Sequence, residues 1–141
     1  MLEENKCLIQ RFVEVAFNKG NLDVADEVYA STFVSHDPTT PEGQGSPESV
    51  KQFVNTYLNA FPDGHTTVED VVTEGDKVAY RWTFRGTHQG ELMGISPTDK
   101  QVEITGITIN RLSGGKIEEQ WNVFDQLGIL RQLGVAPAPG Q

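Results

Sequence analysis

Asp125 is the carboxylate that the sequence places best for acid/base chemistry. It ends a run of alternating residues in which Trp121 and Val123 share its face, so we expect an apolar surround. A carboxylate that is withdrawn from water is a stronger base near neutral pH, and apolar pockets tune acid/base catalysis in this way. The alternative is that Asp125 caps a helix that begins at Gln126. The two roles are compatible, and the sequence leaves both open.

Two of the three histidines are further candidates for a functional site. His88 follows an aromatic strand at the mouth of the expected pocket, and His36 follows the apolar residues Phe33 and Val34. The alternative for both is a loop histidine that bonds to a backbone carbonyl. No two of the three histidines have the spacing of a metal-binding pair, so we predict no metal and assign His65 no role.

Large apolar side chains at strand spacing predict a binding wall for an apolar ligand. Within 78–88 the even positions form one apolar face and the odd positions, which include Arg81 and Arg85, form the other. Aromatic residues at this spacing also serve as ordinary core, and the sequence alone does not separate the two uses. The candidate wall residues are Trp82, Phe84, Trp121, Phe33, Met93 and Tyr80.

Helical periodicity in the first half of the chain gives way to two-residue alternation in the second half. Apolar residues at three-and-four spacing predict helices near 3–18, after Asn21 and after Ser46, and Tyr29 is the last apolar position of the second of these. Turn signals at Gly75 and Gly114 separate the alternating runs that follow. A short helix is expected from Asp125 to Leu133. The predicted strands are 65–74, 78–88, 101–112 and 116–125. Such an order predicts an α+β domain in which helices cover one face of a sheet.

The charge balance excludes whole classes of partner. The 141 residues carry 20 acidic and 11 basic side chains, for a formal charge of −9, and the basic residues are scattered singly. Nucleic acids and anionic membranes bind clusters of Lys and Arg, so we expect neither as a partner. Acidic residues near the start lead into a helical pattern, so we predict no signal peptide, no membrane span and a cytoplasmic location. We expect one domain, 1–141, with a frayed tail at 135–141.

Several stretches in order and spacing resemble the SnoaL-like polyketide cyclase family. They are Phe33-Val34-Ser35-His36-Asp37-Pro38, Gly86-Thr87-His88-Gln89-Gly90-Glu91, Gly94-Ile95-Ser96-Pro97-Thr98 and Trp121-Asn122-Val123-Phe124-Asp125-Gln126-Leu127-Gly128. The resemblance runs from about Lys6 to Gly134. It implies a cone-shaped α+β barrel of the nuclear transport factor 2-like superfamily, with N-terminal helices packed on a curved, mostly antiparallel sheet that encloses a pocket.

The resemblance also implies a reaction. Cyclases of this family close a ring in a polyketide ester by aldol condensation without metal or organic cofactor, and the position that matches their aspartate is Asp125. His88 and His36 would then donate hydrogen bonds to an enolate oxygen, the ligand would be apolar and polycyclic, and the protein would be a homodimer. The alternatives are a binding protein without activity, a ketosteroid isomerase-like enzyme, or an epoxide hydrolase-like enzyme, which needs an Asp-Arg-Asp arrangement in the pocket.

Overall fold

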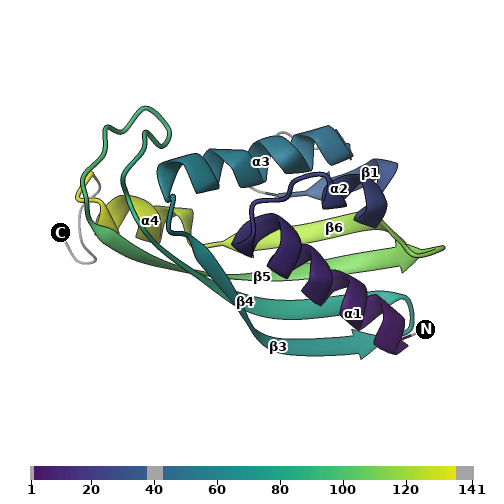
Figure 1. Ribbon diagram of the computed structural model, residues 1–141. Helices are drawn as coiled ribbons and strands as arrows, with labels where there is room; N and C mark the ends of the chain where they lie inside the picture. The colour runs from purple at the N-terminus through teal and green to yellow at the C-terminus, as the bar shows by residue number, and fades with distance from the viewer. Residues whose placement is uncertain (1, 38–42, 136–141) are drawn as a thin grey trace.

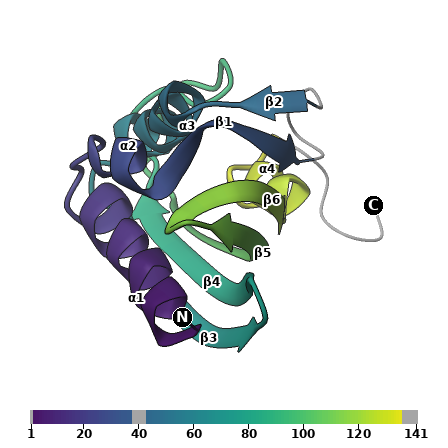
Figure 2. The ribbon, with the colours of Figure 1, turned by 90° about the vertical axis from the view of Figure 1, so that its right-hand side faces the viewer.

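Helices cover one face of a curved six-stranded sheet in the computed structural model, which describes residues 2–37 and 43–135 (Figures 1 and 2). We call the face toward α1, α2 and α3 the inner face and the opposite one the outer face. The strands are β1 (Tyr29–His36), β2 (Gly43–Gly45), β3 (His65–Glu74), β4 (Lys77–Thr87), β5 (Gln101–Ser113) and β6 (Lys116–Phe124). The helical segments are α1 (Leu2–Phe12), the π-helical turn η1 (Val13–Asn18), α2 (Val24–Val28), α3 (Pro47–Ala60) and α4 (Gln126–Gln132).

The order of the strands confirms the predicted α+β class. The sheet runs β2-β1-β6-β5-β4-β3, and every neighbouring pair is antiparallel except β1 with β6. Among the described residues β2 and β3 remain edge strands, so the sheet is curved without closing on itself. Figure 2 shows β2 and β3 at opposite ends of this curve.

Local sequence signals account for most of the boundaries. Ser46 caps α3 by accepting a hydrogen bond from Ser49 N, with Pro47 in the first turn, where its missing N–H costs nothing. The expected hairpins are confirmed, with Glu74 paired to Lys77 and Ser113 paired to Lys116. The helix expected at 3–18 is α-helical to Phe12 and π-helical beyond it.

The first two strands are not predicted by the sequence analysis, which placed Tyr29 at the end of a helix. That placement is wrong, because Tyr29 opens β1 and pairs with Ile117 of β6. The partner lies far along the chain, so local patterning gives no sign of it. Of the tail expected at 135–141, residues 136–141 lie outside the described part of the chain, as does the stretch 38–42 between β1 and β2.

A β-bulge in β6 reverses the faces predicted for that strand. Arg111 pairs with Glu119 but Leu112 pairs with Ile117, so Glu118 is an extra residue. One extra residue inverts the alternation beyond it. The residues that point to the inner face after the bulge are Gln120, Asn122 and Phe124. The prediction that Trp121 and Val123 face the pocket is therefore wrong, and Val123 is 59% exposed.

Two groups of buried side chains hold the layers together. One gathers Ile9 and Phe12 of the first helix with Val78 and Ile117 of the sheet, and the other packs Phe61 against the sheet and the last helix. Several large apolar residues remain exposed on the outer face, namely Val72, Ile107, Ile109 and Val123. The homodimer stays a prediction. No helix in the described part of the chain is long and apolar enough to cross a membrane.

Candidate functional site

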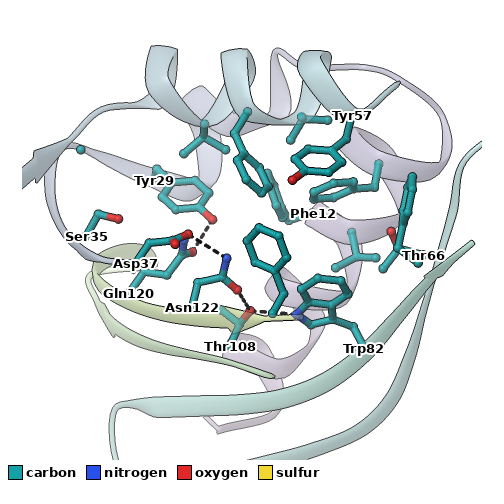
Figure 3. A pocket seen from close by; sticks show the side chains of 18 of the residues that line it. Phe12, Tyr29, Ser35, Asp37, Tyr57, Thr66, Trp82, Thr108, Gln120 and Asn122 are labelled. Atoms are coloured by element: carbon teal, nitrogen blue, oxygen red, sulfur yellow. Dashed lines mark hydrogen bonds between the residues drawn. The ribbon is translucent and has the colours of Figure 1, made fainter. Parts of the chain in front are cut away.

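A cavity of about 410 Å³ lies between the helices and the inner face of the sheet (Figure 3). Its walls come from α1, the π-helical turn and α3 on one side and from β1, β3, β4, β5 and β6 on the other. The helix side contributes mainly apolar groups. The sheet side adds most of the polar ones, which are Ser35, Asp37, Thr66, Thr108, Gln120 and Asn122, and α3 adds Ser49.

Four of the six predicted wall residues line this cavity: Phe33, Tyr80, Trp82 and Phe84. The alternation predicted for β4 is thereby confirmed. Trp82 lies over Gly106 of the neighbouring strand, where the indole occupies the space that a side chain at position 106 would need. Glycine at this position therefore allows the indole ring to lie against the floor of the cavity.

A directed chain of hydrogen bonds crosses the floor of the cavity and ends on a carboxylate. Trp82 Nε1 donates to Thr108 Oγ1 at 3.0 Å, and Thr108 Oγ1 donates to Asn122 Oδ1 at 2.7 Å. Asn122 Nδ2 then donates to Asp37 Oδ2 at 3.1 Å. An indole N–H can only donate, which leaves the hydroxyl proton for the amide oxygen and turns the amide nitrogen toward Asp37. Figure 3 shows this chain from Trp82 to Asp37.

Asp37 is the one acidic or basic residue among the described residues that line the cavity. It follows directly after β1 and is half-buried. On β1 the inner-face positions are Phe33 and Ser35, and Asp37 continues that alternation. The sequence contained this signal, but the strand itself was not recognised.

All three tyrosines of the chain line the cavity as well. Burial raises the pKa of Tyr80 to about 12. Burial, aided by the negative charge of Asp37, raises the pKa of Tyr57 to about 12. Burial also raises the pKa of Tyr29 well above its usual range, and its hydroxyl donates to Gln120 Oε1 at 2.6 Å. The three phenols therefore remain protonated at neutral pH and can act as hydrogen-bond donors.

Asp125 lies outside the residues that line the cavity. Its side chain is exposed and accepts a hydrogen bond from Gly128 N at 2.8 Å, at the start of α4. The expected apolar surround is wrong because the bulge in β6 inverts the parity on which it was based, whereas the alternative role as a helix cap is confirmed. Asp125 as the base stays a prediction with no support from the cavity.

The two candidate histidines lie in different parts of the fold. His88 is fully buried in the connection after β4, where its Nδ1 accepts a hydrogen bond from Thr98 N at 3.2 Å. His36 lies on the outer face, where its Nε2 is 2.8 Å from Glu119 Oε2 and its ring stacks on Trp121 at 5.2 Å. Neither histidine lines the cavity. Hydrogen bonds from His36 and Arg111 hold the pKa of Glu119 below its usual range.

Two predicted wall residues and the arginines also point elsewhere. Trp121 belongs to the outer face, and Met93 is 49% exposed in the connection between β4 and β5. Arg81 forms an exposed ion pair with Asp70, which agrees with its predicted place on the strand face opposite to that of Trp82. No arginine is among the described residues that line the cavity. The described side chains hold no group of three or more potential metal ligands.

Comparisons with known proteins point to a single family. The SnoaL-like polyketide cyclase model matches residues 7–133. Nogalonic acid methyl ester cyclase from Streptomyces nogalater is 31% identical over 123 residues, which cover 84% of this chain and 90% of that protein.

Solved structures agree in fold. IdmH from Streptomyces antibioticus is 36% identical with a TM-score of 0.80, covering 93% of this chain and 99% of its own. AclR from Streptomyces galilaeus, a candidate hydroxylase, is 30% identical with a TM-score of 0.86, covering 98% of this chain and 89% of its own. Because relatives with this fold are named for different reactions, the residues of the cavity have to carry any functional argument.

Proposed function

Because the chain belongs to the SnoaL-like polyketide cyclase family, we propose that it cyclises a polyketide ester by acid/base chemistry in its aromatic cavity, with Asp37 as the base. The observation that carries the proposal is the position of Asp37, the one ionisable carboxylate among the described lining residues, at the end of the hydrogen-bond chain through Thr108 and Asn122. The ring-closing chemistry needs no oxidant and no reductant.

Asp37 would take a proton from a carbon next to a carbonyl group of the bound ester. The resulting enolate carbon attacks a second carbonyl within the same molecule, a carbon–carbon bond forms, and the alkoxide receives the proton that Asp37 had taken. The donor that holds Asp37 matters here, because Asn122 Nδ2 fixes the carboxylate in one orientation. The orientation of the Asp37 carboxylate is therefore set before the ligand enters.

Tyr57 is the donor that we assign to the developing enolate oxygen. Its hydroxyl points into the cavity (Figure 3), and its raised pKa keeps the proton on the phenol at neutral pH. The electrostatic effect of Asp37 on Tyr57 supports their placement around one ligand. A neutral phenol in an aromatic cavity stabilises a developing negative charge without itself losing a proton.

Aromatic side chains would hold the ring system of the ligand. Phe12 and Phe53 line the helix side of the cavity, whereas Trp82, Phe84 and Phe124 line the sheet side. Flat apolar walls of this kind favour a polycyclic or preorganised polyketide. A binding protein without activity has the same walls, so the distinction between the two functions is tested at Asp37, the proposed base.

The test compares Asp37→Asn with Asp125→Asn, using nogalonic acid methyl ester as the substrate and product formation as the readout. Asparagine keeps the size of each side chain, and at position 125 it also serves as a helix cap. We expect Asp37→Asn to lower kcat by about 10²–10⁴-fold, the usual contribution of a general base, while binding of the ester persists.

Each outcome discriminates between the assignments. Loss of turnover in Asp125→Asn with normal turnover in Asp37→Asn would restore the base predicted from the sequence. Binding of the ester by the wild-type chain without any product would favour a binding protein. Loss of turnover in Asp37→Asn alone would support the cyclase proposal.

A further inference from the structure

Thr66 carries a hydroxyl that the hydrogen-bond chain of the cavity leaves out. The residue lines the cavity from β3 and is only 6% exposed, yet its Oγ1 is buried without a hydrogen-bond partner. A buried hydroxyl without a partner destabilises the folded protein relative to an apolar group of the same shape. Valine has that shape, so stability alone does not explain threonine at this position.

The surroundings of Thr66 offer no partner for its hydroxyl among the described residues. Its cross-strand neighbour on β4 is Phe84. The nearby amide of Asn18 is already engaged, since its Oδ1 accepts from Thr66 N at 2.7 Å and its Nδ2 donates to Thr66 O at 3.0 Å. Asn18 Nδ2 also donates to Glu14 Oε2. The side-chain amide therefore binds the backbone of Thr66, and the hydroxyl of this cavity-lining residue is left without a partner.

The same contacts hold Thr66 in a fixed place. Asn18 ends the π-helical turn η1, whose residues Val13 and Phe17 also line the cavity. Turns of this kind occur frequently at functional sites. The two hydrogen bonds to one amide tie this turn to the edge strand β3, so the backbone that carries the hydroxyl is held in place before any ligand binds.

Thr66 lies across the cavity from the carboxylate. Asp37 follows β1 and Thr66 belongs to β3, and the sheet order places four strand spacings between them. At about 4.8 Å per strand this is roughly 19 Å along the sheet, and less straight across because the sheet curves. Figure 3 shows Asp37 and Thr66 on opposite sides of the cavity.

We propose that the Thr66 hydroxyl is a second polar subsite, which binds a carbonyl or hydroxyl oxygen at the end of the ligand remote from Asp37. The inference rests on the proposed function only in assuming that the cavity takes a polyketide ester. It adds a requirement on the ligand, which must carry an oxygen at each end of an otherwise apolar body. A hydroxyl can donate to a carbonyl oxygen or accept from a hydroxyl group, so it suits either.

The experiment measures stability and binding in the same variants. Trp121→Phe, on the outer face, leaves Trp82 in the cavity as the single tryptophan and so as the fluorescence reporter. In this background Thr66→Val removes the hydroxyl and Thr66→Ser keeps it, and nogalonic acid methyl ester is the probe. Urea unfolding of each free protein gives its stability.

We expect Thr66→Val to raise the stability of the free protein and to weaken its binding of the ester. Thr66→Val should unfold at a higher urea concentration than the parent, because an unpaired hydroxyl is lost, while its dissociation constant for the ester rises about 3–10-fold through the lost hydrogen bond. Thr66→Ser should bind the ester within about twofold of the parent. Thr108→Val is the matched control, because the hydroxyl of Thr108 has two partners and its loss should lower the stability.

Three results would overturn the subsite. Thr66→Val could be less stable than the parent, which means that the hydroxyl is already paired in the free protein, for example with an enclosed water molecule. It could bind the ester as tightly as the parent. Thr66→Ser could weaken binding as much as Thr66→Val, which would indicate a packing effect.

The subsite and the proposed function fail in different ways. A chain that binds and converts the ester while Thr66→Val binds it equally well loses the subsite and keeps the cyclase function. A chain that binds the ester through Thr66 without converting it keeps the subsite and loses the cyclase function. A wild-type chain that does not bind the ester refutes both for this ligand.

Discussion

Raising the pH should unfold the protein, because the three tyrosines of the chain are all buried around its cavity. In the unfolded chain a tyrosine ionises near its ordinary pKa of 10.0, whereas burial raises the pKa of Tyr57 and Tyr80 to about 12 in the folded protein. Between these values the unfolded state binds fewer protons than the folded state. The free energy of unfolding therefore falls as the pH rises.

The size of the effect follows from the pKa values. At about 1.4 kcal/mol for each pH unit between the two values, Tyr57 and Tyr80 together lower the free energy of unfolding by about 5 kcal/mol at pH 12. Tyr29, whose pKa is also raised by burial, adds to this loss. Domains of this size are stable by roughly 5–15 kcal/mol, so we expect cooperative unfolding between about pH 10 and 12. Below pH 10 the contribution of the tyrosines to stability is fully present.

The assay follows tyrosinate absorbance and far-ultraviolet circular dichroism in one alkaline titration. We expect both signals to change together, well above the pH at which the protein titrates in concentrated urea. Tyr57→Phe serves as a control, and it should remove about a third of the tyrosinate signal and shift unfolding to higher pH. Tyrosinate absorbance that rises near pH 10 while the circular dichroism stays native would refute the burial of these phenols.

Two substitutions test the hydrogen bonds around the site. Thr108→Val leaves Trp82 Nε1 and Asn122 Oδ1 without their partner. At about 1–3 kcal/mol for each buried unpaired group, the protein should lose about 2–6 kcal/mol in urea unfolding. An unchanged stability would mean that water replaces the hydroxyl. Asp125→Ala should cost about 1 kcal/mol through loss of the cap on α4, and Asp125→Asn should cost little. Equal losses in the two Asp125 variants would contradict the capping role.

The expected aromatic wall shows what a local pattern can establish. Tyr80, Trp82 and Phe84 alternate in a strand that pairs without interruption with β5, so their common face follows from the sequence. The helix start at Ser46 and the two hairpin turns depend on a few adjacent residues, and they too were predicted. The family follows from motifs spread along the chain, and the match over residues 7–133 confirms it.

The position of the acid/base group depended on tertiary structure. The bulge at Glu118 turns Asn122 inward and leaves Asp125 at the surface, and no local signal in the sequence announces that bulge. Asp37 reaches the cavity because β1 joins the sheet beside β6, which follows it by more than 80 residues. Similarly, His88 became a buried loop residue rather than a cavity donor.

The sequence by itself determined the α+β class, the family and the apolar face of β4. Only the tertiary structure decided which polar groups share the cavity, because strand register and pairing between distant segments set the direction of each side chain. A one-residue change in register exchanges the two faces of a strand. For this reason the same alternating residues of β6 that pointed to Asp125 in the sequence place Asn122 beside Asp37 in the folded protein.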